Sequence, residues 1–215
     1  MLKLSDLKKQ LKKDVGSFLK PKGFKRSGDS FNQESEIGFN RMNIVIAYYA
    51  TAGSWLNFAA TIFIESLDET LKEFHNSTRG YQNDNYHVLI GNLTALKNET
   101  HPYRQDILTL EDVEDALNSF YVDYDKNIHP FFDQYSTIEA VESYLNRNFE
   151  LSDLLLPKND KAMIGITLAH LLNKENVKEI FDNYMGSWQM STFDDNLKKH
   201  QILELEQLIK FLGYS

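Results

Sequence analysis

Two neighbouring segments of alternating residues constrain the fold of this chain more than any other feature. Apolar side chains occupy every second position of residues 39–50 and again of residues 56–65: Met42, Ile44, Ile46 and Tyr48, then Leu56, Phe58, Ala60, Ile62 and Ile64. Side chains at alternate positions of a strand lie on one face, so each segment predicts a strand with one apolar face. The short link between them predicts an antiparallel hairpin.

Other strands and helices are predicted around this hairpin. Strands are expected at 24–33, 39–50, 56–65 and 86–93, and helices at 5–19, 67–75, 109–128 and 137–146. Residues 96–108 are expected to be irregular, and Pro130 is expected to end or kink the helix before it. The pattern predicts an α+β fold: an antiparallel sheet of about five strands, flanking helices and a C-terminal helical subdomain. We expect an α+β domain over 1–150 and a helical extension packed on it over 151–215.

The junction between the first helix and the first strand carries a family resemblance. Pro21 and Gly23 end the helix, and Gly28-Asp29 turns a short hairpin. The run Leu19-Lys20-Pro21-Lys22-Gly23-Phe24-Lys25-Arg26-Ser27-Gly28-Asp29-Ser30-Phe31 resembles the opening of a family of uncharacterised bacterial domains, with the pattern L-K-P-x-G-F-K-[KR]-x-G-x-x-F. A weaker likeness at His129–Asp133 and Ser136–Glu139 extends it to about residue 146. The resemblance implies a fold and no catalytic residues. Such proteins are similar to immunity proteins of toxin systems.

Composition excludes several classes of protein. The chain has 0 cysteines, which excludes a disulfide framework, thiolate zinc sites and cysteine catalysis, and which indicates a reducing compartment. No segment approaches the ~20 apolar residues of a membrane helix. The lysines of the N-terminal segment interrupt any signal-peptide core. We therefore expect a cytoplasmic protein that does not bind a membrane.

Charge is distributed unevenly along the chain. The net charge is -8, yet residues 1–26 hold eight lysines and Arg26 against two aspartates, a charge of +7 that leaves -15 for the rest. The acidic body disfavours nucleic acid and favours a protein partner, with a basic one best suited to it. A basic first helix could bind a membrane or nucleic acid. The favoured interpretation is a helix packed on the sheet with a solvated lysine face.

The sequence contains no recognisable catalytic constellation. Its histidines form no H-E-x-x-H pair, no G-x-S-x-G turn is present, and the triplet Asp123-Tyr124-Asp125 lacks the glycine and glutamate of a calcium loop. We therefore predict no catalytic residues, no metal and no cofactor. The alternative is acid–base chemistry at His129 with Asp125 and Asp133, which would need a cleft.

The second face of the hairpin is the candidate binding surface. It carries aromatic, cationic and amide side chains, with these expected to contribute: Phe39, Arg41, Asn43, Tyr49, Asn57 and Phe63. Aromatic and arginine side chains are typical anchors of partners and ligands, although later helices could bury them instead. The pattern favours a non-enzymatic protein-interaction module, in particular an immunity-type toxin inhibitor. The alternative is a small-ligand-binding domain or an enzyme of unknown reaction that uses this face or the His129 region. The oligomeric state is left open.

Overall fold

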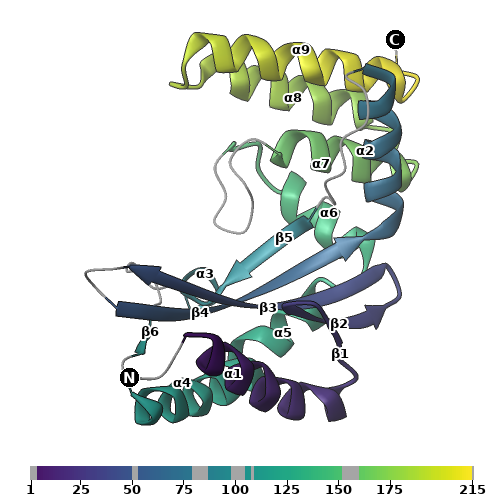
Figure 1. Ribbon diagram of the computed structural model, residues 1–215. Coiled ribbons are helices and arrows are strands. Elements are labelled where there is room, and N and C mark those ends of the chain that lie inside the picture. Colours follow the sequence, from purple (N-terminus) through teal and green to yellow (C-terminus); the bar gives the residue numbers. More distant parts are fainter. Residues whose placement is uncertain are drawn as a thin grey trace. The chain divides into compact units, whose positions relative to one another are not determined.

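The protein has an α+β fold, as the sequence predicts (Figure 1). The computed structural model describes residues 4–49, 53–78, 87–97, 105–107, 109–151 and 160–214. The chain divides into two compact units: unit 1 is Met1–Phe63 with Leu89–Gln134, and unit 2 is Ile64–Val88 with Tyr135–Ser215. The helical extension was expected to begin at residue 151. Unit 2 also includes residues 64–88 and 135–150, which precede and follow the second segment of unit 1 in the sequence.

Unit 1 is built around the antiparallel sheet. Its strands are β1 (Lys25–Ser27), β2 (Ser30–Ser35), β3 (Gly38–Tyr49), β4 (Gly53–Ile64), β5 (His87–Asn92) and β6 (Gln105–Ile107). They follow the order β1-β2-β3-β4-β5, and β6 pairs with the beginning of β4. The strands predicted from periodicity are therefore all present, and β6 is an addition.

The helices of unit 1 pack on one face of this sheet. They are α1 (Leu4–Leu19), the 3₁₀ turn η1 (Lys20–Lys22), α3 (Leu93–Leu96), α4 (Leu110–Asp123), the π turn η2 (Tyr124–Ile128) and α5 (His129–Gln134). Figure 1 shows α1 beside α4 below the sheet, and the Phe18 ring of α1 stacks on Tyr121 of α4 with centroids 4.4 Å apart. The face against these helices forms the core of unit 1, which we call the inner face; the opposite side is the outer face.

The inner face is apolar, as the alternation predicts. Phe58 of β4 and Phe120 of α4 are both fully buried, and their rings stack with centroids 4.1 Å apart. Along β3, Met42 is buried, whereas Ile44 and Ile46 are only half-buried. Coverage of the inner face therefore weakens toward the C-terminal half of β3.

The structure differs from two local expectations in this unit, as far as residues 96–97, 105–107 and the path through Pro130 are described. Residues 96–108, expected to be irregular, contain the end of α3 and the strand β6, which is too short for a periodic pattern to reveal. Pro130 does not end the helical path, which passes through the π turn η2 directly before it and continues to Gln134 in α5. The π turn lets the His129 N–H bond the Tyr124 carbonyl, and Pro130 falls in the first turn of α5, where no amide donor is needed.

Unit 2 is helical. Its helices are α2 (Glu65–Thr78), α6 (Ile138–Asn146), α7 (Lys161–Leu171), α8 (Val177–Met190) and α9 (Asp195–Phe211). The central helix α7 is buried from Lys161 to Ala169 and packs against the other four. Asn173 follows the end of α7 and has the left-handed conformation, with φ of 52°, in the turn that leads to α8. Among the helices of the described ranges, none is long and apolar enough to cross a membrane.

Candidate functional site

Three of the predicted binding residues lie together on the outer face of the sheet. The Phe39 and Phe63 rings stack with centroids 4.3 Å apart and planes 16° apart. The Arg41 guanidinium carbon lies 4.9 Å from the centre of the Phe39 ring, within the range of a cation–π contact. These three residues form one cluster, which we call the Arg41 cluster. Tyr49 was also predicted here, but its side chain lies outside the described residues.

Two polar residues of β2 extend the Arg41 cluster. In the β2–β3 register Asn32 lies opposite Arg41, and Ser30 opposite Asn43. The Arg41 Nε donates to Asn32 Oδ1 at 3.0 Å, and the Ser30 hydroxyl donates to Asn43 Oδ1 at 2.7 Å. Periodicity missed Ser30 and Asn32 as members of this surface because it does not set a register. The two-residue turn between Ser35 and Gly38 is the sequence signal that would have set it.

The outer face keeps polar groups that could bind a partner. Phe63 is buried, while Phe39, Arg41, Asn43 and Asn57 are half-buried. Partial burial lowers the pKa of Arg41 from its ordinary value, but an arginine stays protonated at neutral pH. The buried Asn57 Oδ1 has no hydrogen-bond partner within the described part of the chain. A half-desolvated arginine beside stacked rings is a surface suited to binding.

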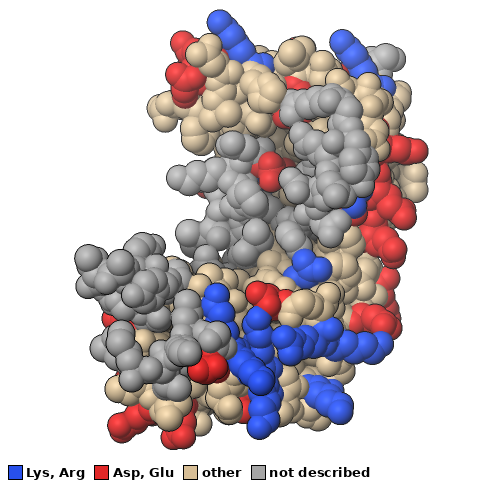
Figure 2. Space-filling view, in the orientation of Figure 1, with Lys and Arg blue, Asp and Glu red and all other residues tan. Residues whose placement is uncertain are grey.

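A hollow of about 400 Å³ lies where α1 meets β3. It is lined by Lys8, Lys12, Asp29, Ser30, Asn43, Ile44, Val45 and Ile46. Lys12 forms an ion pair with Asp29, and this contact, with the charges of Lys8 and Arg26, lowers the pKa of the Asp29 carboxyl. Figure 2 shows lysine and arginine side chains gathered over α1 and the neighbouring strands. The hollow therefore has aliphatic and cationic sides.

A second hollow of about 490 Å³ lies beside α4, and most of the residues that line it have polar side chains. Its lining residues are Lys97, Gln105, Asn118, Ser119, Val122 and Asp123. Lys97 Nζ and Asp123 Oδ1 lie 3.5 Å apart across it. The Gln105 Oε1 is buried and has no hydrogen-bond partner among the residues described, so it could accept a hydrogen bond from a small polar ligand.

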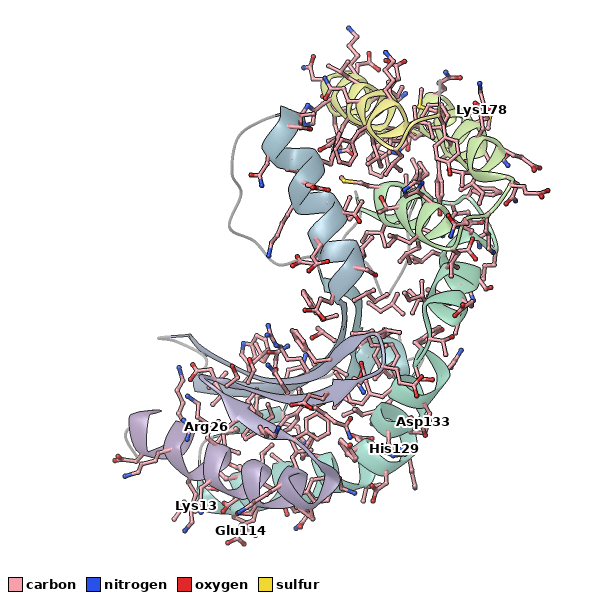
Figure 3. The ribbon with its side chains drawn as sticks, turned by 90° about the vertical axis from the view of Figure 1, so that its right-hand side faces the viewer. Lys13, Arg26, Glu114, His129, Asp133 and Lys178 are labelled. Atoms are coloured by element: carbon pink, nitrogen blue, oxygen red, sulfur yellow. The ribbon has the colours of Figure 1, made fainter. Side chains whose placement is uncertain are left out.

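The His129 region is only partly assembled. His129 Nδ1 lies 3.0 Å from Asp133 Oδ2, but both side chains are more than half exposed, at 55% and 68%, and Figure 3 shows the pair on the outside of α5. Asp125 instead forms an ion pair with Lys22 at 3.1 Å. Open solvation leaves an acid–base pair without the excluded-water environment that tunes such groups. Within the described ranges, no three metal-binding side chains come together.

In unit 2, folding raises the pKa of the Asp160 carboxyl. Burial, and then the negative charge of Glu204, raise the pKa of Asp160 above its ordinary value of 3.8. The native state therefore binds this proton more tightly than the unfolded state, so stability falls as the pH rises from about 4 through the native pKa. We expect Asp160→Asn to raise the melting temperature at pH 7 by about 1–2 °C and to reduce the dependence on pH below it.

Differential scanning calorimetry between pH 4 and pH 7 measures this effect. Asp195→Asn is the matched control, because the Asp195 side chain is 88% exposed at the start of α9. We expect no gain in melting temperature from the control. An Asp160→Asn protein that is less stable than the wild type at pH 7 would contradict the prediction.

The family resemblance of the N-terminal junction stays a prediction. In comparisons with protein families, with curated proteins and with solved structures, no match to this chain was found.

Proposed function

We propose that this chain is a cytoplasmic, non-enzymatic protein-interaction module, of the kind that inhibits a toxin as an immunity protein. The observation that carries the proposal is the Arg41 cluster, in which Arg41 lies against the stacked rings of Phe39 and Phe63 on the outer face of the sheet. Arginine and aromatic side chains account for much of the binding energy at protein interfaces.

The chemistry around this cluster supports a protein as the partner. Among hydrogen bonds between described residues, Arg41 uses only its Nε, so its remaining N–H groups can reach a partner's carboxylate or carbonyl oxygens. The Asn32 side chain of β2 holds the guanidinium in place, which reduces the entropy lost on binding. Carrying the anchor on a strand also fixes its position more firmly than a loop would.

Arg41→Ala is expected to weaken binding of the partner at least about tenfold, since it removes an interface anchor. The partner should be sought among proteins co-expressed from the neighbouring genes of the native host, and its affinity measured by isothermal titration calorimetry. Arg147→Ala is the matched control, because Arg147 also lies over an aromatic ring, 4.2 Å from the centre of Tyr144, but belongs to unit 2 and not to the sheet. The control should bind as the wild type does.

Two outcomes would contradict the proposal. One is a partner whose affinity Arg41→Ala leaves unchanged. The other is no partner at all, together with a small molecule that is turned over or that raises the melting temperature by mass action. The second outcome would favour the alternative of ligand binding, for which the hollow lined by Gln105 is the first place to look.

A further inference from the structure

We propose that the edge of β3 beyond Asn43 is a docking site for an extended, acidic segment of the partner, which adds to the sheet as a further strand. The inference rests on the proposed function and specifies how the partner is held. Strand addition uses backbone hydrogen bonds for affinity and side-chain pockets for specificity. The structure has to supply a free edge, a pocket beside it and a charge that selects the segment.

The free edge follows from the register of β2. β2 pairs with β3 from Ser35 opposite Gly38 to Ser30 opposite Asn43, and there it turns away into β1. β3 continues to Tyr49. In the described part of the chain, no strand pairs with β3 on this side beyond Asn43. An uncovered edge of this kind is a template for another strand.

The backbone groups of this edge point outward at alternate residues. Gly28 has φ of 61° in the two-residue turn between Ser27 and Ser30, and such a turn closes on a hydrogen-bonded pair. Ser30 therefore directs its N–H and C=O toward β1, and Phe31 directs its own toward Met42. Continuing the alternation along β3, the N–H and C=O of Ile44 and Ile46 point to the side that β2 no longer covers.

The hollow of about 400 Å³ lies along this same edge. Ile44 and Ile46 are half-buried on the inner face, and Val45 is 40% exposed on the outer face. Side chains from both faces line the hollow, which is the arrangement expected beside the edge of a strand. An added strand would cover this aliphatic surface with its own alternating side chains.

The charge of the hollow selects an acidic segment. Lys8 and Lys12 of α1 line it, and Lys12 already holds the Asp29 carboxylate at its end. With Lys12 paired to Asp29, the two lysines and one aspartate of the hollow leave a net charge of +1 that attracts a carboxylate of the added strand. This local charge counts for more than the acidic body of the chain, because exposed charges farther than about 10 Å apart are largely screened at ordinary ionic strength.

A peptide fits this site better than a nucleic acid does. A phosphate backbone needs cations alone, whereas here the cations stand over half-buried isoleucines and next to outward-pointing amides. Lys9 and Lys13 provide the contrast, because they are exposed on α1, and Figure 3 shows Lys13 on the side away from the sheet. Nucleic-acid binding would use these two lysines as readily as Lys8 and Lys12.

The test uses the full chain and a synthetic peptide of about eight residues in which glutamate alternates with valine, the length of an ordinary strand. A peptide with lysine in place of glutamate is its control. We expect the acidic peptide alone to bind, more weakly as salt is raised, and to slow hydrogen exchange at the amides of Ile44 and Ile46. Fluorescence anisotropy measures the affinity, and NMR measures the exchange.

Paired variants separate the edge from general charge. Lys8→Gln with Lys12→Gln should weaken peptide binding about fivefold, and Lys9→Gln with Lys13→Gln should leave it nearly unchanged. Ile46→Pro removes an outward N–H and should cost about tenfold or more, whereas Ile46→Ala keeps that donor and should cost less. Proline is tolerated at an edge whose N–H is not used in the sheet.

Several results would overturn the inference. One is that the acidic peptide does not bind, and another is that both lysine pairs lower its affinity equally. A third is that the peptide slows hydrogen exchange at sites other than β3. The last is that a single-stranded oligonucleotide binds more tightly than the peptide and depends on all four lysines. If the partner from the host still binds and depends on Arg41 but not on Lys8, Lys12 or Ile46, the edge proposal falls while the proposed function stands. If the acidic peptide binds at the edge but a partner from the host binds Arg41→Ala as tightly as the wild type, the proposed function falls while the edge proposal stands.

Discussion

Phe120→Ala is expected to lower the free energy of unfolding by about 3–5 kcal/mol. The Phe120 ring is fully buried between α4 and the sheet, where it stacks on Phe58 and meets Phe18 of α1 edge-on at 5.7 Å. Its removal loses the apolar area and leaves a cavity that three different elements border, so none of them can close it alone. The loss is a large part of the 5–15 kcal/mol that ordinarily holds a domain folded.

Urea denaturation followed by circular dichroism measures this loss. Val122→Ala is the matched control, because Val122 lies on the same helix and is 51% exposed. We expect the control to change the free energy of unfolding by less than about 0.5 kcal/mol. A cost of under about 1 kcal/mol for Phe120→Ala would show that α4 does not cover the inner face of the sheet.

The sheet could be predicted from sequence because its signal is local. Alternation over β3 and β4 identified both strands and placed Phe39, Arg41 and Phe63 on one face, where they form a cluster. The same pattern could not show that Met42 is buried while Ile44 is half exposed. That difference depends on how far α1 reaches along the sheet, which is a property of tertiary packing.

The polar parts of the candidate site were beyond the reach of periodicity for a related reason. Asn32 joins Arg41 through the register of β2 and β3, and Lys12 reaches Asp29 across 17 positions of sequence. The sequence pattern of an amphipathic helix predicts that its lysines face solvent, whether or not a strand edge lies beside them. Only the fold distinguishes Lys8 and Lys12 from Lys9 and Lys13.

Unit boundaries were the least predictable feature. Helices α2 and α4 each have apolar residues along one side. The Phe74 ring of α2 nevertheless lies 5.6 Å from Phe211 of α9, whereas Phe120 of α4 packs on the sheet. An apolar stripe shows that a helix is packed but not what it is packed against. The element against which a helix packs is determined by the chain connections and by the shapes of side chains on both elements. The sequence of one segment does not contain this information.

Gly165→Ala and Gly186→Ala are expected to change stability in opposite directions, although both replace a glycine inside a helix of unit 2. A Cβ at Gly186 of α8 would have no atom within 4 Å, so alanine should stabilise the protein by about 0.5–1 kcal/mol through its better helix propensity. At Gly165 of α7 a Cβ would overlap Asn146 Oδ1 and lie 3.0 Å from the Tyr184 hydroxyl oxygen. We expect that substitution to cost at least about 2 kcal/mol.

The cost at Gly165 arises because Asn146 cannot move aside freely. Its Nδ2 donates to Glu142 Oε1 at 2.8 Å and to the Gly165 carbonyl at 3.1 Å, and its Oδ1 accepts from the Tyr184 hydroxyl at 3.0 Å. Glu142 and Tyr184 are both buried, so displacing Asn146 strips partners from groups that water cannot reach. Thermal and urea unfolding of both variants measure the difference. Equal stability of the two proteins would mean that α6, α7 and α8 do not meet at this hydrogen-bond network.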